Sequence, residues 1–206
     1  MSPFEFFFTF YGLLLGFSVA ELVGGFSRLL RDRGWRGLKL LTALLGLFLV
    51  LDLATFWNQA WLVFRQAPYN FALLIVGLVV ASVFYVAASL VFPHRADVDL
   101  DEHFWRHRRT VILSALGANL LVIGLILWVT SATGEITRIP NAATLWGGAA
   151  FFSLAMLVAA MARGRKVVLV TLVLLIAYTA VNIGRSASAL AARGGWPVFQ
   201  APAAPR

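Results

Sequence analysis

Six continuous apolar runs, each long enough to cross a lipid bilayer, constrain this chain more than any other feature. A helix needs about 20 mostly apolar residues to cross roughly 30 Å of hydrocarbon. The runs cover residues 4–30, 38–64, 69–92, 111–131, 142–162 and 167–190. They are continuously apolar rather than alternating, which favours helices over the strands of a membrane barrel. The sequence therefore predicts an all-α polytopic membrane protein, a bundle of six transmembrane helices.

Composition leaves little room for a separate soluble domain. Of the 206 residues, 61% are hydrophobic and 13% are charged, whereas a soluble domain has about 25% charged residues. We therefore expect one transmembrane domain over residues 1–206, with a cytoplasmic loop at 93–110 and a polar C-terminal tail at 191–206. The first run lacks a positively charged start and is too long for a secretory signal, so we expect it to be retained. Cysteine is absent, which excludes disulfides, thiolate metal sites and cysteine nucleophiles.

The basic residues set the expected orientation. Most of the seventeen Lys and Arg residues lie in the loops that follow the first, third and fifth runs: Arg28, Arg31, Arg33, Arg36, Lys39, Arg95, Arg106, Arg108, Arg109, Arg163, Arg165 and Lys166. The positive-inside rule places these loops in the cytoplasm and both termini outside. We expect the arginines of the 93–110 loop to contact anionic lipid head groups at the cytoplasmic face. A nucleic-acid partner is not expected, because no binding module accompanies the net charge of +8.

Polar residues inside the predicted spans are the candidate functional residues, because ionisable groups in a bilayer normally face a protein interior or a water cavity. Helical spacing puts two sets on one face each: Asp52, Thr55 and Gln59 in the second span, and Tyr178, Asn182 and Arg185 in the sixth. We expect an ion pair between Asp52 and Arg185. Two interpretations remain open for these residues. They form either polar contacts that hold the bundle together or the lining of a pore or solute-binding vestibule.

Nearer the cytoplasm, Glu21 lies in the first span and Asn119 lies eight residues into the fourth. We expect them to meet as gate or coupling residues. The alternative is that Glu21 reaches the interface and pairs with Arg28 or Lys39.

The first span also carries a small residue at every fourth position, which allows another helix backbone to approach closely. This ridge consists of Gly12, Gly16, Ala20 and Gly24. Its expected partner is either another span of the same chain or a second copy in a homo-oligomer.

The longest loop predicts a helix that begins at Asp99 or Asp101 and continues into the fourth span, because its acids precede its bases. His103 and His107 are then spaced i, i+4 on one face, as in a chelating pair. A zinc site normally needs a third protein ligand, and the nearby arginines oppose a cation. An interfacial helix containing Trp105 explains the same composition, so we expect neither a metal nor a cofactor.

Three stretches resemble a family of small, uncharacterised bacterial multi-pass membrane proteins: FYGLLLG at 10–16, AASLVFP at 87–93, and DLDE followed by WRHRR within 99–109. The resemblance covers about the first 120 residues. It implies the bacterial cytoplasmic (inner) membrane as the location and supplies no activity.

The sequence is compatible with two functions. The first is a channel or transporter for an ion or small solute, with its outer vestibule lined by the polar residues of spans two and six. The second is a non-catalytic accessory or scaffold subunit that uses the glycine ridge and the basic loops. No catalytic signature is present, since the chain has no G-x-S-x-G elbow, phosphate-binding glycine loop or H-E-x-x-H motif.

Overall fold

The computed structural model describes residues 3–64, 71–95, 97–132 and 142–192. In chain order the helices are α1 (Pro3–Gly37), α2 (Leu40–Phe64), α3 (Phe71–Ser89), α4 (Leu100–Ala132), α5 (Ala142–Met161) and α6 (Arg165–Ala192). No strand occurs in the described ranges, so the all-α prediction is confirmed for them. Helix α4 begins inside the segment expected to be the 93–110 loop, because Asp99 caps it at that point.

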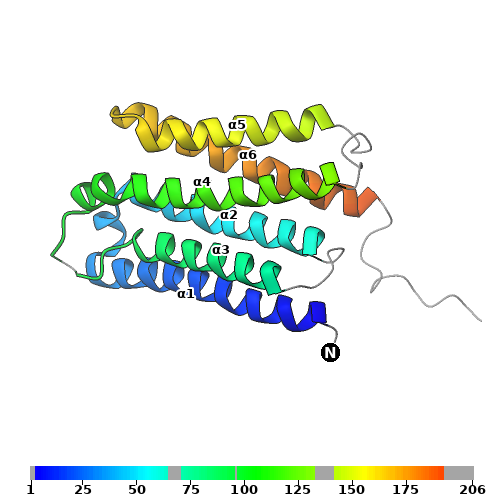
Figure 1. Ribbon diagram of the computed structural model, residues 1–206. Coiled ribbons are helices and arrows are strands. Elements are labelled where there is room, and N and C mark those ends of the chain that lie inside the picture. Colours follow the sequence, from blue (N-terminus) through cyan, green and yellow to red (C-terminus); the bar gives the residue numbers. More distant parts are fainter. Residues whose placement is uncertain (1–2, 65–70, 96, 133–141, 193–206) are drawn as a thin grey trace, which may run out of the picture.

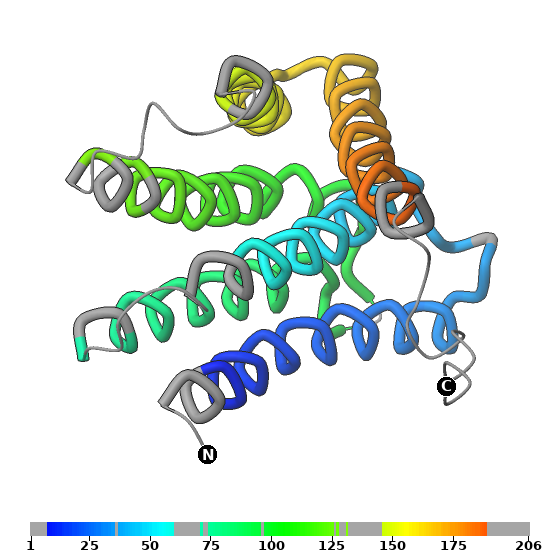
Figure 2. The backbone as a smooth tube through the Cα atoms, turned by 90° about the vertical axis from the view of Figure 1, so that its right-hand side faces the viewer, coloured from blue at the N-terminus to red at the C-terminus, as the bar shows by residue number. Residues whose placement is uncertain are grey.

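The helices run alternately in opposite directions and form two layers (Figure 1). Helices α3, α4 and α5 make one layer, and α1, α2 and α6 make the other (Figure 2). Helix α2 contacts α1, α3, α4 and α6, while α4 contacts α2, α3 and α5. Helices α2 and α4 are therefore the central pair, shared by both halves of the bundle.

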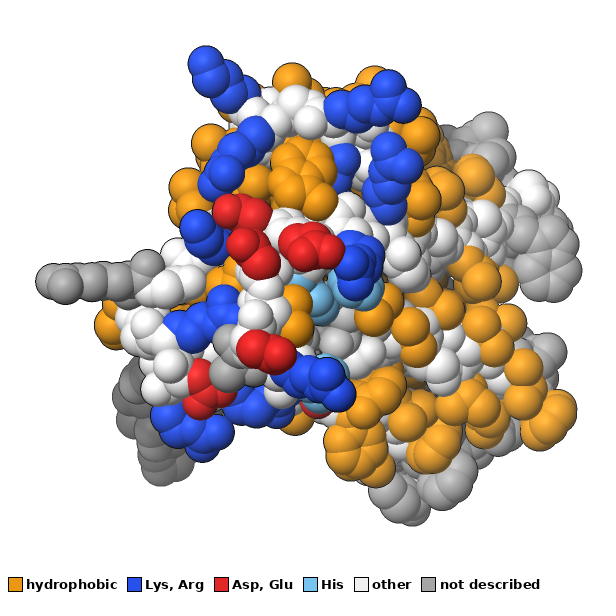
Figure 3. All heavy atoms as spheres, turned by 90° about the vertical axis from the view of Figure 1, so that its left-hand side faces the viewer, with side chains coloured by type: hydrophobic (Ala, Val, Ile, Leu, Met, Phe, Trp, Pro, Cys, Tyr) orange, Lys and Arg blue, Asp and Glu red, His pale blue; other side chains and the backbone are white. Residues whose placement is uncertain are grey.

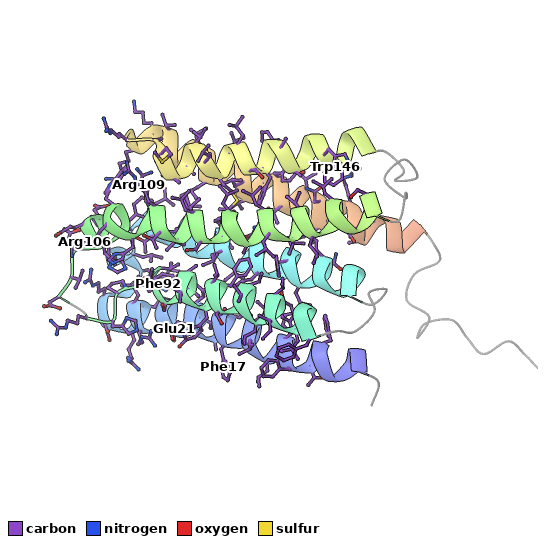
Figure 4. All side chains as sticks on the ribbon, in the orientation of Figure 1. Phe17, Glu21, Phe92, Arg106, Arg109 and Trp146 are labelled. Atoms are coloured by element: carbon purple, nitrogen blue, oxygen red, sulfur yellow. The ribbon has the colours of Figure 1, made fainter. Side chains whose placement is uncertain are left out.

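Four helices contain stretches that are long and apolar enough to cross a membrane: Phe8–Trp35, Leu40–Gln59, Leu100–Leu125 and Arg165–Ser188. Within the described residues, α3 and α5 hold shorter apolar stretches, Leu74–Ser89 and Trp146–Met161. The outer surface is apolar as well as the core. Leu13, Val23 and Leu154 are each more than half exposed, and Phe17 points away from the bundle (Figure 4). Helices that are apolar all round are typical of membrane spans.

Phe92, just after α3, packs into the space left by two glycines, Gly25 of α1 and Gly46 of α2. We call this contact the Phe92 seat. A Cβ atom added at Gly25 would lie 2.9 Å from Cβ and Cδ2 of Phe92, and one added at Gly46 would lie 2.8 Å from Cζ. Phe92 as a residue is 4% exposed, so its ring has little space into which to move. Close packing of α1, α2 and the end of α3 therefore requires glycine at both positions.

The small-residue ridge of α1 is only partly used inside the chain. Gly12 packs against Trp57 of α2, with a Cβ position 3.0 Å from the indole ring. A Cβ at Gly16 would meet nothing within 4 Å, and Ala20 is exposed. The closest contact between a glycine of α1 and a residue outside that helix is instead at Gly25, which the ridge does not include.

We expect Gly25→Ala to destabilise the fold by about 1–3 kcal/mol, the usual cost of overpacking. Gly16→Ala is the matched control, because it adds the same methyl group to the same helix in open space. The measurement is thermal unfolding in detergent, followed by the fluorescence of the seven tryptophans. Equal unfolding temperatures for the two variants would contradict the role given to the Phe92 seat.

Candidate functional site

The acid in the second predicted span, Asp52, lies at the centre of the bundle and is bonded to α4. Its side chain is buried, with 2% of the residue exposed. The amide nitrogen Nδ2 of Asn119 lies 3.2 Å from Oδ1 and 3.1 Å from Oδ2 of Asp52, and it also donates to the carbonyl oxygen of Ala115 at 2.9 Å. Asp52 and Asn119 thus form a polar bridge between the two central helices.

The surroundings of this bridge along α2 are apolar. Phe48, Leu49, Leu53 and Phe56 precede and follow Asp52 by one residue or one turn, and all four are buried. The Phe56 ring continues this apolar layer, with its centroid 4.9 Å from that of Phe84 on α3. A carboxyl group in such a shell is costly unless it is hydrogen-bonded, and Asn119 supplies the bond.

The expected ion pair between Asp52 and Arg185 is not formed, and Arg185 is exposed on α6. Depth along the helices explains the error. Arg185 lies twenty residues after the start of α6 and Asp52 twelve residues after the start of α2, a difference of about 12 Å at 1.5 Å per residue. Both helices begin at the same end of the bundle, where Arg165 and Lys39 each approach Asp101.

The remaining residues of the expected outer vestibule do not converge on Asp52. Thr55 donates to the carbonyl oxygen of Leu51, one turn back on its own helix, at 2.9 Å. Gln59 is exposed and Asn182 is half-buried. Tyr178 belongs to the contact between α5 and α6, where its ring lies 5.4 Å from that of Phe151 and its hydroxyl approaches Gly148.

Glu21 does not meet Asn119, which is bonded to Asp52. Glu21 Oε1 instead lies 3.0 Å from the Arg28 guanidinium and 3.8 Å from Nε2 of His94. The alternative in which Glu21 pairs with Arg28 is therefore the arrangement found. The expected depth of Asn119 was too shallow because it was counted from residue 111. Helix α4 begins eleven residues earlier, at Leu100.

A large charged face covers the end of the bundle where α1, α3 and α5 finish and α2, α4 and α6 begin (Figure 3). Asp101 lies between two helix starts on this face, 3.4 Å from Nζ of Lys39 and 3.7 Å from the Arg165 guanidinium. Arg33 donates to the carbonyl oxygen of Val98 at 2.5 Å. The start of α4 is thereby tied to α1, α2 and α6.

The predicted cap of α4 is confirmed at Asp99. Its Oδ1 accepts hydrogen bonds from the backbone amides of Asp101 at 2.7 Å and Glu102 at 3.3 Å. These bonds favour the ionised carboxylate, so they lower the pKa of Asp99. The cap therefore combines a backbone hydrogen-bond acceptor with a negative charge at the positive end of the helix dipole.

The rings of His103 and His107 lie against one another, with centroids 4.3 Å apart and planes inclined by 34°. Nε2 of His103 lies 3.0 Å from the carbonyl oxygen of Leu90, and Nδ1 of His107 lies 3.0 Å from that of His103. One nitrogen of each ring is therefore committed to the backbone. Among the described residues, no group of three or more His, Cys, Asp or Glu side chains is arranged to hold a metal ion.

Arg108 differs from its neighbours, because it is buried rather than available to lipid head groups. The residue is 2% exposed, and its guanidinium donates to the carbonyl oxygens of Ala159, at 2.7 Å, and Ala162 at the end of α5. The guanidinium carbon also lies 4.3 Å from the centre of the Trp105 ring. Carbonyls at a helix C-terminus lack helical partners and attract a cation, so Arg108 caps α5.

A signal for this role was present in the sequence. Leu100, Phe104, Arg108, Val111 and Ala115 follow one another at helical spacing, and the four apolar members of the series are buried. Helix α4 therefore turns Arg108 inward with its apolar face.

Comparison with models of protein families, with curated protein sequences and with solved structures finds no match to this chain.

We expect Asp52→Leu to lower the free energy of unfolding by about 1–3 kcal/mol, because it removes the acceptor on α2 for the half-buried Asn119 amide and leaves that amide only the Ala115 carbonyl of its own helix. Asp52→Asn keeps a hydrogen-bonding group and should cost less. The double variant Asp52→Leu/Asn119→Leu should cost less than the sum of the single variants, since it removes both polar partners. Strictly additive losses in thermal unfolding would contradict the polar bridge.

A second expectation concerns the pH dependence of the Asp99 cap. Its lowered pKa means that the ionised form stabilises the fold at neutral pH and that this contribution is lost as the pH falls through that pKa. Asp99→Asn should therefore unfold at a lower temperature than wild type at neutral pH, and the gap should close in acid. Asp97→Asn, which removes a nearby exposed charge outside the cap, is the control. A gap that widens in acid would contradict the assignment.

Proposed function

We propose that this chain is a six-span protein of the bacterial cytoplasmic membrane, with its charged face in the cytoplasm and both termini outside. Four helices with membrane-length apolar stretches, an apolar outer wall and charges concentrated at one end support the proposal. Helices α3 and α5, at 19 and 20 residues, are near the length of a span and lie beside the longer helices.

Within that membrane the chain acts as a non-catalytic accessory or scaffold subunit. The polar bridge supports this role over that of a channel. Asp52, the acid expected to line a vestibule, is instead buried among apolar side chains and hydrogen-bonded to Asn119. Gln59 and Arg185, expected beside it, are exposed elsewhere. A solute pathway needs polar groups along a hydrated route, whereas a subunit that binds a partner needs a rigid surface.

The charged face supplies such a surface. Ion pairs at Asp101 and the caps at Asp99 and Arg108 tie four helix ends together by side chains of fixed geometry. Gly16 and Ala20 of the ridge also lie toward the outside of α1, which supports helix packing against a partner or a second copy within the membrane.

The topology is tested with single cysteines, because the chain has none of its own. We expect Asp97→Cys and Arg163→Cys to react with a membrane-impermeant maleimide only when the cytoplasmic side is open. Ser188→Cys, near the other end of the bundle, should react in intact cells. Labelling of all three positions from the same side would contradict an arrangement in which the helices cross the membrane.

The role is tested by ion and proton flux in proteoliposomes, at equal amounts of folded protein. We expect wild type and Asp52→Asn to give the same flux as empty liposomes. Solute-selective flux in wild type that is lost in Asp52→Asn would overturn the accessory role. Such a result would support the other function that the sequence suggests, a permeation route through the bundle.

A further inference from the structure

An apolar groove runs along the outer surface between α3 and α4. Its volume is about 290 Å³, and its walls include Val79 and Val83 of α3 and Leu113 and Leu121 of α4. Gly117 forms part of its lining, and a Cβ added there would meet nothing within 4 Å. The groove is therefore open along the surface that the proposed topology turns toward lipid.

One face of α4 connects this groove to the charged face. Arg106, Thr110, Leu113, Gly117 and Leu121 are spaced by three or four residues, so they lie along one side of the helix. Arg106 precedes Leu113 by seven residues, or about 10 Å. Both Arg106 and Thr110 are exposed. Along α4 the apolar groove is thus followed by a hydroxyl group after about one helical turn and by a cation after two.

The charges around this end favour an anion. Arg106 and Arg109 project from the first half of α4 (Figure 4). Arg109 is exposed and forms no ion pair within the described part of the chain. The acid on this face of α4 is Glu102, 2.6 Å from Arg106, and both side chains of that pair are 68% exposed. An exposed pair of this kind is weak and exchanges readily, so an anionic ligand can replace Glu102 as the partner of Arg106.

We propose that this surface binds one anionic phospholipid, with an acyl chain in the α3–α4 groove and the phosphate at Arg106 and Arg109. The two parts of the surface together match a phospholipid. The groove is suited to a hydrocarbon chain, and the arginines, about 10 Å from it along α4, are suited to an anionic head group. The inference rests on the proposed topology, which turns the groove toward lipid and puts the arginines at the cytoplasmic interface.

Retention of lipid by the purified protein tests the proposal. The full chain is equilibrated in micelles with equal amounts of phosphatidylglycerol and phosphatidylcholine, and bound lipids are counted by native mass spectrometry. We expect one phosphatidylglycerol per chain. Each of Arg106→Gln and Arg109→Gln should lower the ratio of bound phosphatidylglycerol to phosphatidylcholine about fivefold, from roughly 1 kcal/mol per arginine. Glu102→Gln should raise the ratio, because it removes the competing carboxylate.

Two matched controls separate a defined site from general attraction to a basic surface. Gly117→Leu fills the groove and should reduce retention of phosphatidylglycerol. Gly124→Leu makes the same change two turns further along α4 in open space and should leave it intact. Arg163→Gln/Lys166→Gln removes two exposed charges from another part of the charged face and should also leave the ratio unchanged.

Equal loss in the charge control and the arginine variants would overturn the proposal in favour of diffuse electrostatic attraction. Unchanged retention in Gly117→Leu would overturn it as well. A dimer in the same spectra that is lost in Gly117→Leu would identify a second copy as the occupant instead. Because retention is measured on solubilised protein, failure of the lipid site is distinguishable from failure of the topology, which cysteine labelling reports independently.

Discussion

The hydrogen bond between Asp52 and Asn119 joins the two helices on which the rest of the bundle is built. Each of the other four helices packs against α2, α4 or both, so the register of these two helices affects the positions of the others. Between apolar helices in lipid, packing alone tolerates sliding, because lipid tails solvate a leucine as well as another leucine does. A buried carboxyl group has far fewer acceptable positions, because moving away from its donor costs it the hydrogen bond that offsets its burial. The bridge therefore contributes specificity of register in addition to stability.

The distribution of residue types between the core and the outer surface of the bundle is compatible with a hydrocarbon solvent. Its exposed Leu and Val residues would be unfavourable in water, yet many core positions are occupied by the same residue types. The interior differs from the exterior instead in shape and polarity. Glycines make room for aromatic side chains, as at Phe92 and Trp57, and Asp52 is hydrogen-bonded to Asn119. Hydroxyl groups such as Thr171 and Thr179 donate to carbonyls of their own helices, which lets them lie within apolar helices without an outside partner.

The accuracy of the sequence interpretation depended on whether a property was local. Helix positions and the Asp99 cap follow from apolar length and capping chemistry, which the sequence displays directly. The pairing of Asp52 with Arg185 required relative depths in different helices. Those depths were counted from the edges of the apolar runs, at residues 38 and 167, whereas α2 begins at Leu40 and α6 at Arg165, which doubles the difference in depth from four residues to eight. The Phe92 seat was missed for a related reason, because Gly25 and Gly46 become neighbours only once α1, α2 and α3 are packed.

The cations of the charged face differ in whether they can bind an external ligand. A cation that already holds a helix end or an ion pair within the fold is less available than one that does not. Arg108 caps α5, and Lys39 and Arg165 share Asp101, so these three cations are engaged in holding helix ends. Arg28 is likewise paired with Glu21. Arg106 and Arg109 remain on the outer side of α4, where Glu102 is the nearby competitor. Arg163 and Lys166 are exposed on the charged face as well, so exposure alone does not single out the arginines of α4. What Arg106 and Arg109 add is their place on the helix that forms one wall of the apolar groove, where an anion-binding group and a place for a hydrocarbon chain adjoin.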